Sequence, residues 1–330
     1  MSVFDHVEFD NHESVHYFRD DRTGLKAIIS VHSTALGPGA GGTRRWIYNN
    51  DASALTDVLR LSRGMTYKNA VAGLKIGGGK AVILASEDAP KSAVLFRAFG
   101  RCVDSLSGRY VTAEDVGCSV DDMRYVREET QFVSGLPQSG KDAGGDPSPW
   151  TALGCIQGIE AAVQARLGKN SLDGIRVAVQ GVGHVGYYLC RLLHEAGAEL
   201  FIADVNSDNL KITLDAVPAM VGPPSEVLFT DVDVLAPCAL GNILTSSTIP
   251  NVKAKVIAGA ANNQLSTPAD GLRLAQRDIL YAPDYVINAG GIISVAHEYY
   301  GDASEDDVRA DVGRIKDRLA DLFRQAAETG

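Results

Sequence analysis

Runs of apolar residues in the N-terminal part of the chain predict strands and helices in alternation. The segment LKAIISV at 25–31 has the character of a strand, and it leads into the glycine-dense segment 37–42, which we expect to be a loop. Residues 51–65 show apolar positions at helical spacing, and Asp51 is placed to contribute to the N-terminal cap. The other elements expected here are a strand at 81–84, helices at 92–106 and 121–129, and a strand that ends in a turn over GRYVTAEDVG at 108–117.

The second half of the chain predicts a parallel sheet. Ser148 and Pro149 should begin a helix that continues to about residue 166, since a capping side chain followed by proline favours a helix start. Strands at 176–180 and 199–205 enclose a helix, which makes one βαβ unit. The segments DVLAP, KVIAG and ILYAP add further short strands, and an amphipathic helix begins at Glu305. We therefore predict an α/β fold whose second domain follows the polar, glycine-rich linker 138–149.

A glycine motif joins the first strand of this unit to its helix. It is Gly181-Val182-Gly183-His184-Val185-Gly186, in which the first glycine permits a tight turn, the second lets backbone approach a pyrophosphate, and the third permits close helix packing. Asp204 ends the next strand, where a carboxylate can accept hydrogen bonds from adenosine ribose hydroxyls. No arginine follows within DVNSDN, so the motif favours NAD over NADP. The alternative is a structural glycine turn beside a surface aspartate, which the strand and helix on either side disfavour.

Three charged residues near glycine-rich turns are candidates for chemistry. Lys68 lies in MTYKNA, Lys80 in GGGKA and Asp115 in TAEDVG. A lone lysine is ordinarily a solvated surface group, and this alternative applies to both lysines. Lys80, however, passes from three glycines into an apolar strand, so we expect its amine to be partly desolvated. Desolvation lowers the pKa of a lysine toward neutrality, where the amine can serve as a base.

Composition excludes several classes of function. The chain has 330 residues, 45% of them hydrophobic, which suits about two globular domains. A formal charge of -10 disfavours binding to nucleic acid or anionic lipid. No apolar run approaches the roughly 20 residues of a membrane span, and the N-terminus lacks the features of a signal peptide, so we expect a cytoplasmic protein. The histidines show no metal-ligand spacing, and we expect no metal.

Five cysteines occur without CxxC spacing, and their odd number does not suit a complete disulfide framework. We expect reduced thiols at Cys102, Cys118, Cys155, Cys190 and Cys238. Cys238, in APCALG, could be taken for a nucleophile, but packing near the cofactor is the favoured alternative because no basic group follows at short range.

Long motifs in a fixed order resemble one enzyme family. They are LGPGAGGTR, SRGMTYKNAVAGLKIGGGKAVI, GRYVTAEDVG, VAVQGVGHVG, APCALG, VIAGAANNQL and LYAPDYVINAGG. Over residues 10 to 300 or so, the chain is similar to the Glu/Leu/Phe/Val dehydrogenase family, in its leucine, valine, phenylalanine and tryptophan branch. The resemblance implies reversible NAD-dependent oxidative deamination of an apolar L-amino acid to the 2-oxo acid and ammonia. It also implies an N-terminal α/β substrate and oligomerisation domain at 1–135, a Rossmann-like NAD-binding domain at 136–288, a return of 289–330 to the first domain, and a cleft between the two domains.

The resemblance also assigns roles by position. Lys68 matches the lysine that binds the substrate carboxylate, Lys80 the catalytic lysine, and Asp115 its acid and base partner. In the implied mechanism a hydride leaves the substrate Cα, neutral Lys80 helps water attack the resulting iminium, and Asp115 moves protons as ammonia departs. The other matched positions are Gly41 and Gly42 for backbone contact with substrate, Thr151, Asn262 and Asn288 near substrate and nicotinamide, and Ala236 and Cys238 beside the cofactor. Asn262 and Asn263 are alternatively simple turn formers.

The side-chain pocket implied by the family is apolar. Its positions hold Ala40, Ala113, Ile292 and Val295, and Ala40 stands where a glutamate dehydrogenase would carry a lysine. An apolar substrate is therefore expected, either branched-chain or aromatic. The rivals are a catalytically silent NAD-binding regulatory paralogue, and a hydroxy-acid dehydrogenase that would need no ammonia. A homo-oligomer is expected, since most soluble oligomers are symmetric assemblies of one chain.

Overall fold

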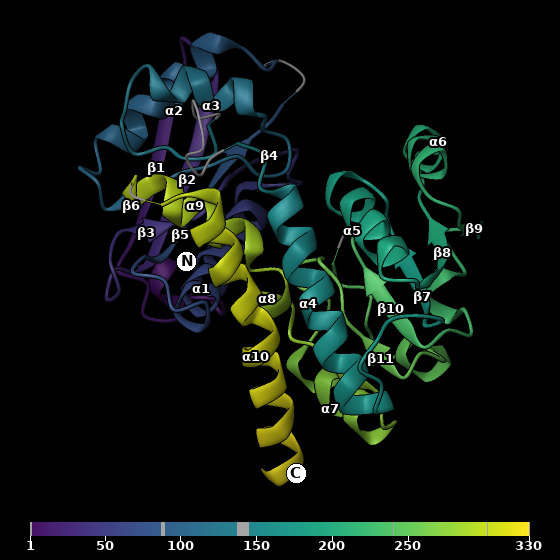
Figure 1. Cartoon of the computed structure of the whole chain (residues 1–330). Helices are drawn as coiled ribbons and strands as arrows, with labels where there is room; N and C mark the ends of the chain where they lie inside the picture. Colours follow the sequence, from purple (N-terminus) through teal and green to yellow (C-terminus); the bar gives the residue numbers. More distant parts are fainter. Residues whose placement is uncertain (1, 87–89, 137–144, 240, 302, 330) are drawn as a thin grey trace. The chain divides into compact units, whose positions relative to one another are not determined.

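A computed structural model of the chain describes residues 2–86, 90–136, 145–239, 241–301 and 303–329, and it contains two compact units (Figure 1). The first unit consists of Met1–Pro147 and Ile292–Val308, and the second of Ser148–Gly291 and Arg309–Gly330. Each unit has a sheet with helices packed on it, so the predicted α/β class is confirmed. The limits differ from the expected domains 1–135 and 136–288. Residues 138–144 of the expected linker 138–149 lie outside the described residues.

The first unit is built on a mixed sheet. Its strands, in the order β1-β2-β5-β3-β6 with β4 also on β5, are β1 (Ser14–Asp20), β2 (Leu25–Ser33), β3 (Gly39–Ala40), β4 (Thr43–Trp46), β5 (Gly77–Leu84) and β6 (Tyr110–Val111). The pairs β1/β2 and β2/β5 are antiparallel, and the other pairs are parallel. Because β3 and β4 pair with β5 in one register, Gly41 and Gly42 between them lie along Gly79 and Lys80.

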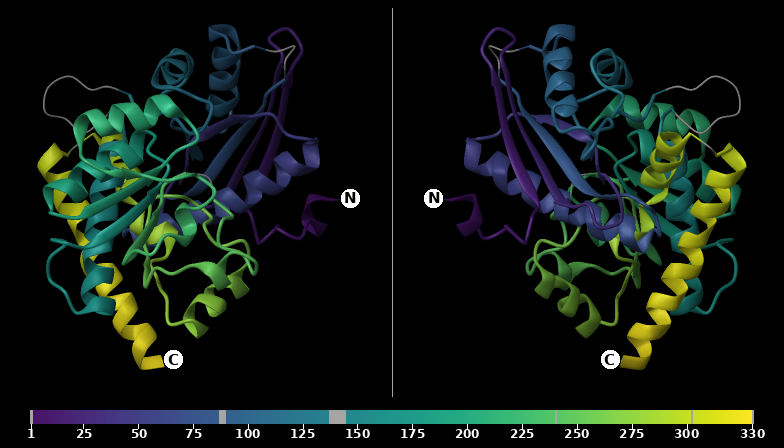
Figure 2. Two further views of the ribbon diagram at one scale, coloured as in Figure 1. Left: turned by 90° about the vertical axis from the view of Figure 1, so that its right-hand side faces the viewer. Right: turned by 90° about the vertical axis from the view of Figure 1, so that its left-hand side faces the viewer.

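Helices cover both faces of this sheet (Figure 2). On one face lies α1 (Asp51–Val71), whose Ala54 and Val58 pack on Ile28 and Val82. On the other face lie α2 (Ala93–Asp104) and α3 (Val120–Arg127), packed on a larger core. Side chains alternate between the faces of a strand, so Lys80 projects on the α1 face together with Val82. A short 3-10 helix, Val3–Asp5, precedes the sheet, and α9 (Gly290–Tyr300) contributes Ala296 to a further apolar cluster.

The strand expected at 25–31 is confirmed as β2, but several other expectations for this unit differ from the structure. The glycine segment 37–42 is not all loop, because β3 enters the sheet there, and β5 begins at Gly77 instead of residue 81. These sheet positions hold glycine because neighbouring segments of the same chain come too close to leave room for a side chain. A Cβ at Gly78 would lie 2.0 Å from Thr66 Oγ1 of α1. Helix α1 also continues to Val71, and its N-cap is Asn50, whose side chain accepts from Ser53 N–H at 2.8 Å.

The second unit is a parallel sheet in doubly wound order. The strands β7 (Arg176–Gln180), β8 (Glu199–Ala203), β9 (Met220–Val221), β10 (Val234–Pro237), β11 (Val256–Ile257) and β12 (Leu280–Tyr281) follow the order β12-β11-β10-β7-β8-β9, all parallel. Chain order therefore reverses between β7 and β10. In such sheets, ligands bind at the carboxyl ends of the strands beside this switch point. Here those ends are Gln180 and Pro237.

The helices of the second unit include both α4 (Ser148–Leu167) and the C-terminal helix α10 (Glu305–Thr329), which lie side by side (Figures 1 and 2). The others are α5 (His184–Glu195), α6 (Ser207–Ala216), α7 (Pro268–Gln276), α8 (Asp284–Ile287) and the 3-10 helices Val227–Phe229 and Ile249–Asn251. None of the described helices is long and apolar enough to cross a membrane. All five cysteines are free thiols, as expected.

The packing of α10 corrects the expected return of 289–330 to the first domain. Only Ile292–Val308 belongs to the first unit, and the chain from Arg309 onward belongs to the second. Two glycines of α4 explain this, because a Cβ at Gly154 or Gly158 would lie 2.7 Å from the Ile315 or Leu319 side chain of α10. Lys316 Nζ also meets Glu160 Oε2 at 2.7 Å.

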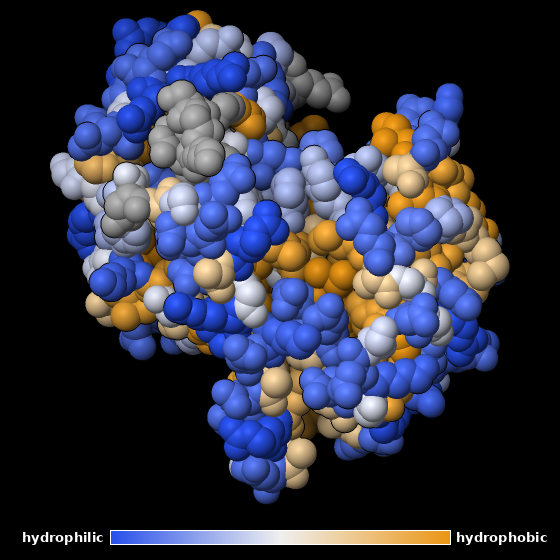
Figure 3. Space-filling model, in the orientation of Figure 1, coloured by the Kyte–Doolittle hydropathy of each residue, from blue (hydrophilic) through white to orange (hydrophobic). Residues whose placement is uncertain are grey.

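The outer edge of the parallel sheet is apolar but short. Both residues of β9, Met220 and Val221, are more than half exposed, and apolar Ile212 of α6 is exposed as well. Figure 3 shows apolar surface on this side of the second unit. A two-residue edge strand offers few backbone groups to another sheet, which limits edge-to-edge pairing.

Two glycine substitutions test the close contact between α1 and β5. Gly78→Ala should destabilise the protein by about 1 to 3 kcal/mol, since a Cβ there overlaps the Thr66 backbone and hydroxyl. Gly64→Ala lies in α1, where a Cβ would meet none of the described atoms within 4 Å. This control should stabilise the protein by about 0.5 to 1 kcal/mol. Chemical unfolding measures the free energy of unfolding of both variants. Equal effects of the two substitutions would contradict the close packing of α1 on β5.

Candidate active site

A short, largely buried ion pair lies in the first unit. Lys80 Nζ of β5 lies 2.6 Å from Asp115 Oδ2, and their side chains are 8% and 20% exposed. The burial expected for Lys80 is confirmed. Charges removed from water are tolerated when they are paired at short range, so each group requires the other. Residues 35 positions apart in the sequence thus form one charged centre on the α1 face of the sheet.

Backbone hydrogen bonds hold Asp115 at this point. The segment from β3 to β4 runs beside residues 109–116: Gly39 N–H donates to Arg109 O at 2.9 Å, Thr43 N–H to Ala113 O at 2.8 Å, and Arg45 N–H to Val116 O at 2.9 Å. A Cβ at Gly42 would lie 2.5 Å from Glu114 O and 2.9 Å from Asp115 Cβ. The glycine therefore lets the Asp115 segment approach β5 closely enough to reach Lys80.

An arginine that the sequence analysis did not select completes the charged centre. Arg44 of β4 places Nε 3.5 Å from Asp115 Oδ2 and Nη1 3.0 Å from Asp57 Oδ2 of α1. Tyr48 donates its hydroxyl to the same Asp57 oxygen at 2.7 Å. Arg44 is part of the motif LGPGAGGTR, but an arginine is ordinarily a surface residue. Only the pairing of Arg44 with Val82 in the strand register reveals its position beside Lys80.

Electrostatics keep the Asp115 carboxylate ionised. Burial alone raises the pKa of this carboxyl, but the charges of Lys80 and Arg44, a hydrogen bond from Lys80 and the Val116 N–H together outweigh burial and hold its pKa well below the usual range. Burial and the hydrogen bond to Asp57 raise the pKa of the Tyr48 hydroxyl, which therefore remains a donor. The centre thus presents a buried carboxylate beside an amine.

Lys68 and Gly41, which are predicted to bind the substrate, lie near the same face. Lys68 is half-buried on α1, which packs on β5 at Gly78. A Cβ at Gly41 would lie 2.0 Å from Gly79 O. The Gly41 carbonyl accepts a hydrogen bond from the buried Tyr110 hydroxyl at 2.6 Å. The peptide at Gly41 is therefore fixed on the sheet beside Lys80.

The predicted pocket residues are apolar and largely buried. Ala40 belongs to a cluster with Ile76, Val111 and Ala296, and Ile292 packs against this cluster. Ala113 and Val295 are 7% and 8% exposed. The structure thus brings Ala40 and Ile292 of the predicted pocket together, although they are far apart in the sequence.

The glycine motif of the second unit forms a tight turn at the switch point. Gly181 has a φ of +88°, and a Cβ there would lie 2.7 Å from the Ala239 Cβ. A Cβ at Gly186 would lie 2.1 Å from Gly181 O, so helix α5 packs closely on the turn. Gly183 differs, because a Cβ there would meet no described atom within 4 Å. Its lack of a side chain leaves open space at the start of α5, where N–H groups favour anions.

Asp204 lies beside this turn. Its Oδ2 accepts from Val182 N–H at 2.8 Å and from the Asn209 amide at 3.4 Å, and its Oδ1 accepts from Asn206 N–H at 2.7 Å. A carboxylate offers about four acceptor positions, so these three donors leave capacity for one more. Val182 precedes Gly183, and His184, which begins α5 with an exposed side chain, is followed by Val185.

Asn262 and Asn288 are joined by a hydrogen bond. The Asn288 amide donates to Asn262 Oδ1 at 2.8 Å and to Ala260 O at 3.0 Å, while the following Asn263 has a φ of +52°. Asn263 is therefore a turn former, as the alternative expects, whereas the side chain of Asn262 is held by a second asparagine.

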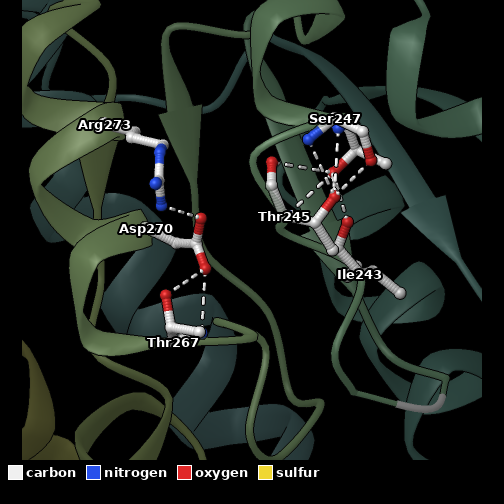
Figure 4. A network of polar contacts seen from close by, with 7 residues as sticks. Ile243, Thr245, Ser247, Thr267, Asp270 and Arg273 are labelled. Atoms are coloured by element: carbon white, nitrogen blue, oxygen red, sulfur yellow. Dashed lines mark hydrogen bonds and ion pairs between the residues drawn. The ribbon is translucent and has the colours of Figure 1, made fainter.

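Two local networks of polar contacts lie in the second unit, one within residues 243–248 and one at the start of α7 (Figure 4). Asp270 Oδ2 accepts from the Thr267 N–H and hydroxyl, both at 2.8 Å, and its Oδ1 accepts from Arg273 at 2.8 Å. Thr245 Oγ1 accepts from the Ser247 and Thr248 N–H groups at 3.2 and 3.1 Å. The Asn242 N–H and Asn263 O lie 2.7 Å apart, which ties the two loops together.

The remaining predicted cofactor residues lie at different depths. Thr151 is half-buried in the first turns of α4, and Ala236 is completely buried within β10. Burial raises the pKa of the Cys238 thiol to about 12, which leaves little thiolate at neutral pH and supports packing over nucleophilic attack. Within the described ranges, no three His, Cys, Asp or Glu side chains are grouped as metal ligands.

Comparison with known proteins matches one family across most of the chain. The family described as "Glu/Leu/Phe/Val dehydrogenase, dimerisation domain" matches residues 12–132. The family described as "Glutamate/Leucine/Phenylalanine/Valine dehydrogenase" matches residues 146–209 and 206–330. The two matches correspond closely to the parts of the chain that carry the two sites.

Individual relatives are similar over nearly their whole length. The chain is 48% identical to the leucine dehydrogenase of Geobacillus stearothermophilus, over 98% of this chain and 88% of that protein. It is 43% identical to the phenylalanine dehydrogenase of Bacillus thermotolerans, over 97% and 84%. The crystal structure of L-tryptophan dehydrogenase from Nostoc punctiforme, 46% identical, superposes with a TM-score of 0.80 over 97% of this chain and 91% of that one.

Two glycines of the turn should respond differently to alanine. Gly181→Ala should destabilise the second unit by about 1 to 3 kcal/mol, because it forces a positive φ and a contact with Ala239. Gly183→Ala should change the free energy of unfolding by less than about 0.5 kcal/mol. Chemical denaturation compares them, and a large loss in Gly183→Ala would show that this glycine has a packing role.

Proposed function

Because the chain belongs to the Glu/Leu/Phe/Val dehydrogenase family, we propose that it is an NAD-dependent dehydrogenase that deaminates an apolar L-amino acid to the 2-oxo acid and ammonia, and also runs in reverse. The observation that carries this proposal is the buried Lys80–Asp115 pair at 2.6 Å. Relatives named as leucine, tryptophan and phenylalanine dehydrogenases support the apolar substrate class.

The turn at Gly181 fits a dinucleotide. The open space at Gly183 would admit the pyrophosphate, and the remaining acceptor capacity of Asp204 would serve a ribose hydroxyl. The Asp204 charge would also repel a 2′-phosphate, which favours NAD over NADP. Thr151, Asn262 and Asn288 would face the nicotinamide end, with Ala236 and Cys238 packed behind it. When bound, NAD supplies the two-electron oxidation of the substrate α-carbon.

The first unit would hold the amino acid and move its protons. Lys68 would pair with the α-carboxylate, and the backbone at Gly41 and Gly42 would contact the substrate. Lys80, once neutral, would take a proton from the water that adds to the iminium carbon. Asp115, ionised beside it, would receive and return protons as ammonia leaves. Their burial excludes bulk water, which strengthens these interactions.

The family match also bears on the oligomeric state. The matched family description names a dimerisation domain over residues 12–132, which supports a homo-oligomer through the first unit. Five free thiols suit the reducing cytoplasm, where we propose that the enzyme acts.

The direct test is ammonia-dependent oxidation of NADH. We expect turnover with at least one of 4-methyl-2-oxopentanoate, phenylpyruvate and indolepyruvate, only when ammonium is present, and little with 2-oxoglutarate. Lys80→Met should lower kcat by about 100- to 10,000-fold, the usual contribution of a base in a proton-transfer step. The loss of NADH absorbance measures both the dependence on ammonium and the effect of the substitution.

Lys26→Met serves as the matched control, since Lys26 is an exposed lysine on the same sheet, and it should keep full activity. Absence of turnover in the unaltered protein would favour the catalytically silent NAD-binding alternative. Turnover without ammonium would favour a hydroxy-acid dehydrogenase.

Pocket size should control the choice of substrate. Ala40→Leu fills space in the apolar cluster at Ala40 and Ile292, so it should lower kcat/KM for the aromatic oxo acids relative to the branched-chain one by about 10- to 200-fold. The KM for NADH should not change. An unaltered ratio of the two substrate classes would place the side-chain pocket elsewhere.

A further inference from the structure

A continuous row of polar side chains lies behind Asp115. The Tyr48 hydroxyl donates to Asp57 at 2.7 Å, Asp57 accepts from Arg44 at 3.0 Å, Arg44 reaches Asp115 at 3.5 Å, and Asp115 pairs with Lys80 at 2.6 Å. The side chains of Arg44 and Asp57 are only 21% and 24% exposed. The row thus extends from helix α1 through β4 to the charged centre.

We propose that Arg44 is a positioning residue that holds the Asp115 carboxylate against Lys80, with Asp57 and Tyr48 fixing the guanidinium from the other side. The proposal rests on the dehydrogenase function proposed above, and it assigns no contact with substrate to Arg44. In this proposal the Arg44 guanidinium is a second cation, besides Lys80, that acts on the Asp115 carboxylate.

Geometry favours arginine for this role. The guanidinium is a planar fork that can address two carboxylates at once, which a lysine ammonium on a flexible stem does less well. Both ends of the Arg44 residue are fixed, since Thr43 and Arg45 on either side donate their backbone N–H groups to Ala113 and Val116. Asp57 is fixed as well, because α1 packs on the sheet through Ala54 and Val58. The direction of the guanidinium is therefore set by the fold.

The electrostatic consequence falls on Asp115. The titratable groups around it are Lys80, Arg44, Tyr48, Tyr110, Cys118 and, through Arg44, Asp57. Burial raises the pKa values of Tyr48, Tyr110 and Cys118, so these groups are neutral at neutral pH. Among the described residues, Lys80 and Arg44 are the cations whose charges oppose the effect of burial on this carboxylate. Loss of Arg44 leaves one cation, and the Asp115 pKa should then rise.

The experiment compares Arg44→Met, Arg44→Lys, Tyr48→Phe and the unaltered protein in the NADH, ammonium and oxo-acid assay across pH. We expect Arg44→Met to lower kcat by about 10- to 100-fold with little change in the KM for the oxo acid, because Arg44 acts on the Asp115 carboxylate and contacts no substrate. The pKa of Asp115 should rise by about 1 to 3 units, the usual effect of losing one nearby opposite charge. Arg44→Lys keeps the charge but lacks the fork, so its kcat should fall between those of Arg44→Met and the unaltered protein. Tyr48→Phe should lower kcat slightly.

Two controls separate positioning from general loss of structure. NADH binding tests whether each variant is folded, and Arg60→Met removes a half-exposed arginine of α1 that should not affect activity. An unchanged kcat in folded Arg44→Met would overturn the proposal. If Arg44→Met does not fold, unchanged kcat in both Arg44→Lys and Tyr48→Phe would overturn it. No ammonia-dependent turnover in the unaltered protein would instead overturn the proposed function, and this proposal with it.

Discussion

The burial of a lysine and a carboxylate in one contact constrains the first unit more than any other interaction. Lys80 and Asp115 lie 2.6 Å apart with little exposure, and an ion removed from water needs a partner at short range. To bring Asp115 that close, the backbone at Gly41 and Gly42 must lie against Gly79 and Glu114, where a Cβ would come within 2.0 to 2.5 Å of a carbonyl oxygen. This contact therefore accounts for the glycines of the segments LGPGAGGTR and GLKIGGGK.

The second unit meets a similar requirement with backbone groups instead of side-chain charges. Gly181 and Gly186 bring the turn and helix α5 together, and Gly183 leaves space at the helix N-terminus. Asp204 holds the turn through Val182 N–H and keeps acceptor capacity. In both units, glycine allows a close backbone approach, and a neighbouring carboxylate lies at the resulting site. In the proposed function, glycine-rich motifs therefore serve two different ligands, the amino acid in the first unit and NAD in the second.

Sequence reasoning succeeded where a local pattern determines the structure. The glycine motif, the strand at 176–180 and the burial of Lys80 all follow from neighbours within about ten residues. It failed where distant segments decide. Gly39 and Ala40 form a strand only because β5 and β6 pair with them, and α10 joins the second unit because Gly154 and Gly158 of α4 admit its side chains. Arg44 was missed for the same reason, since its partners Asp57 and Asp115 come from separate elements.

The most direct measurement of the charged centre is the titration of Asp115 itself by NMR of carboxyl-labelled aspartate, with the signal assigned by an Asp115→Asn variant. The pKa of this group is depressed, so the carboxylate should stay ionised from pH 7 down past the ordinary value of 3.8, until the protein unfolds. Its contribution to stability is present above the unfolded-state pKa and is lost as pH falls through the folded one. Titration between pH 4 and 7 would contradict the account, because burial would then outweigh Lys80 and Arg44.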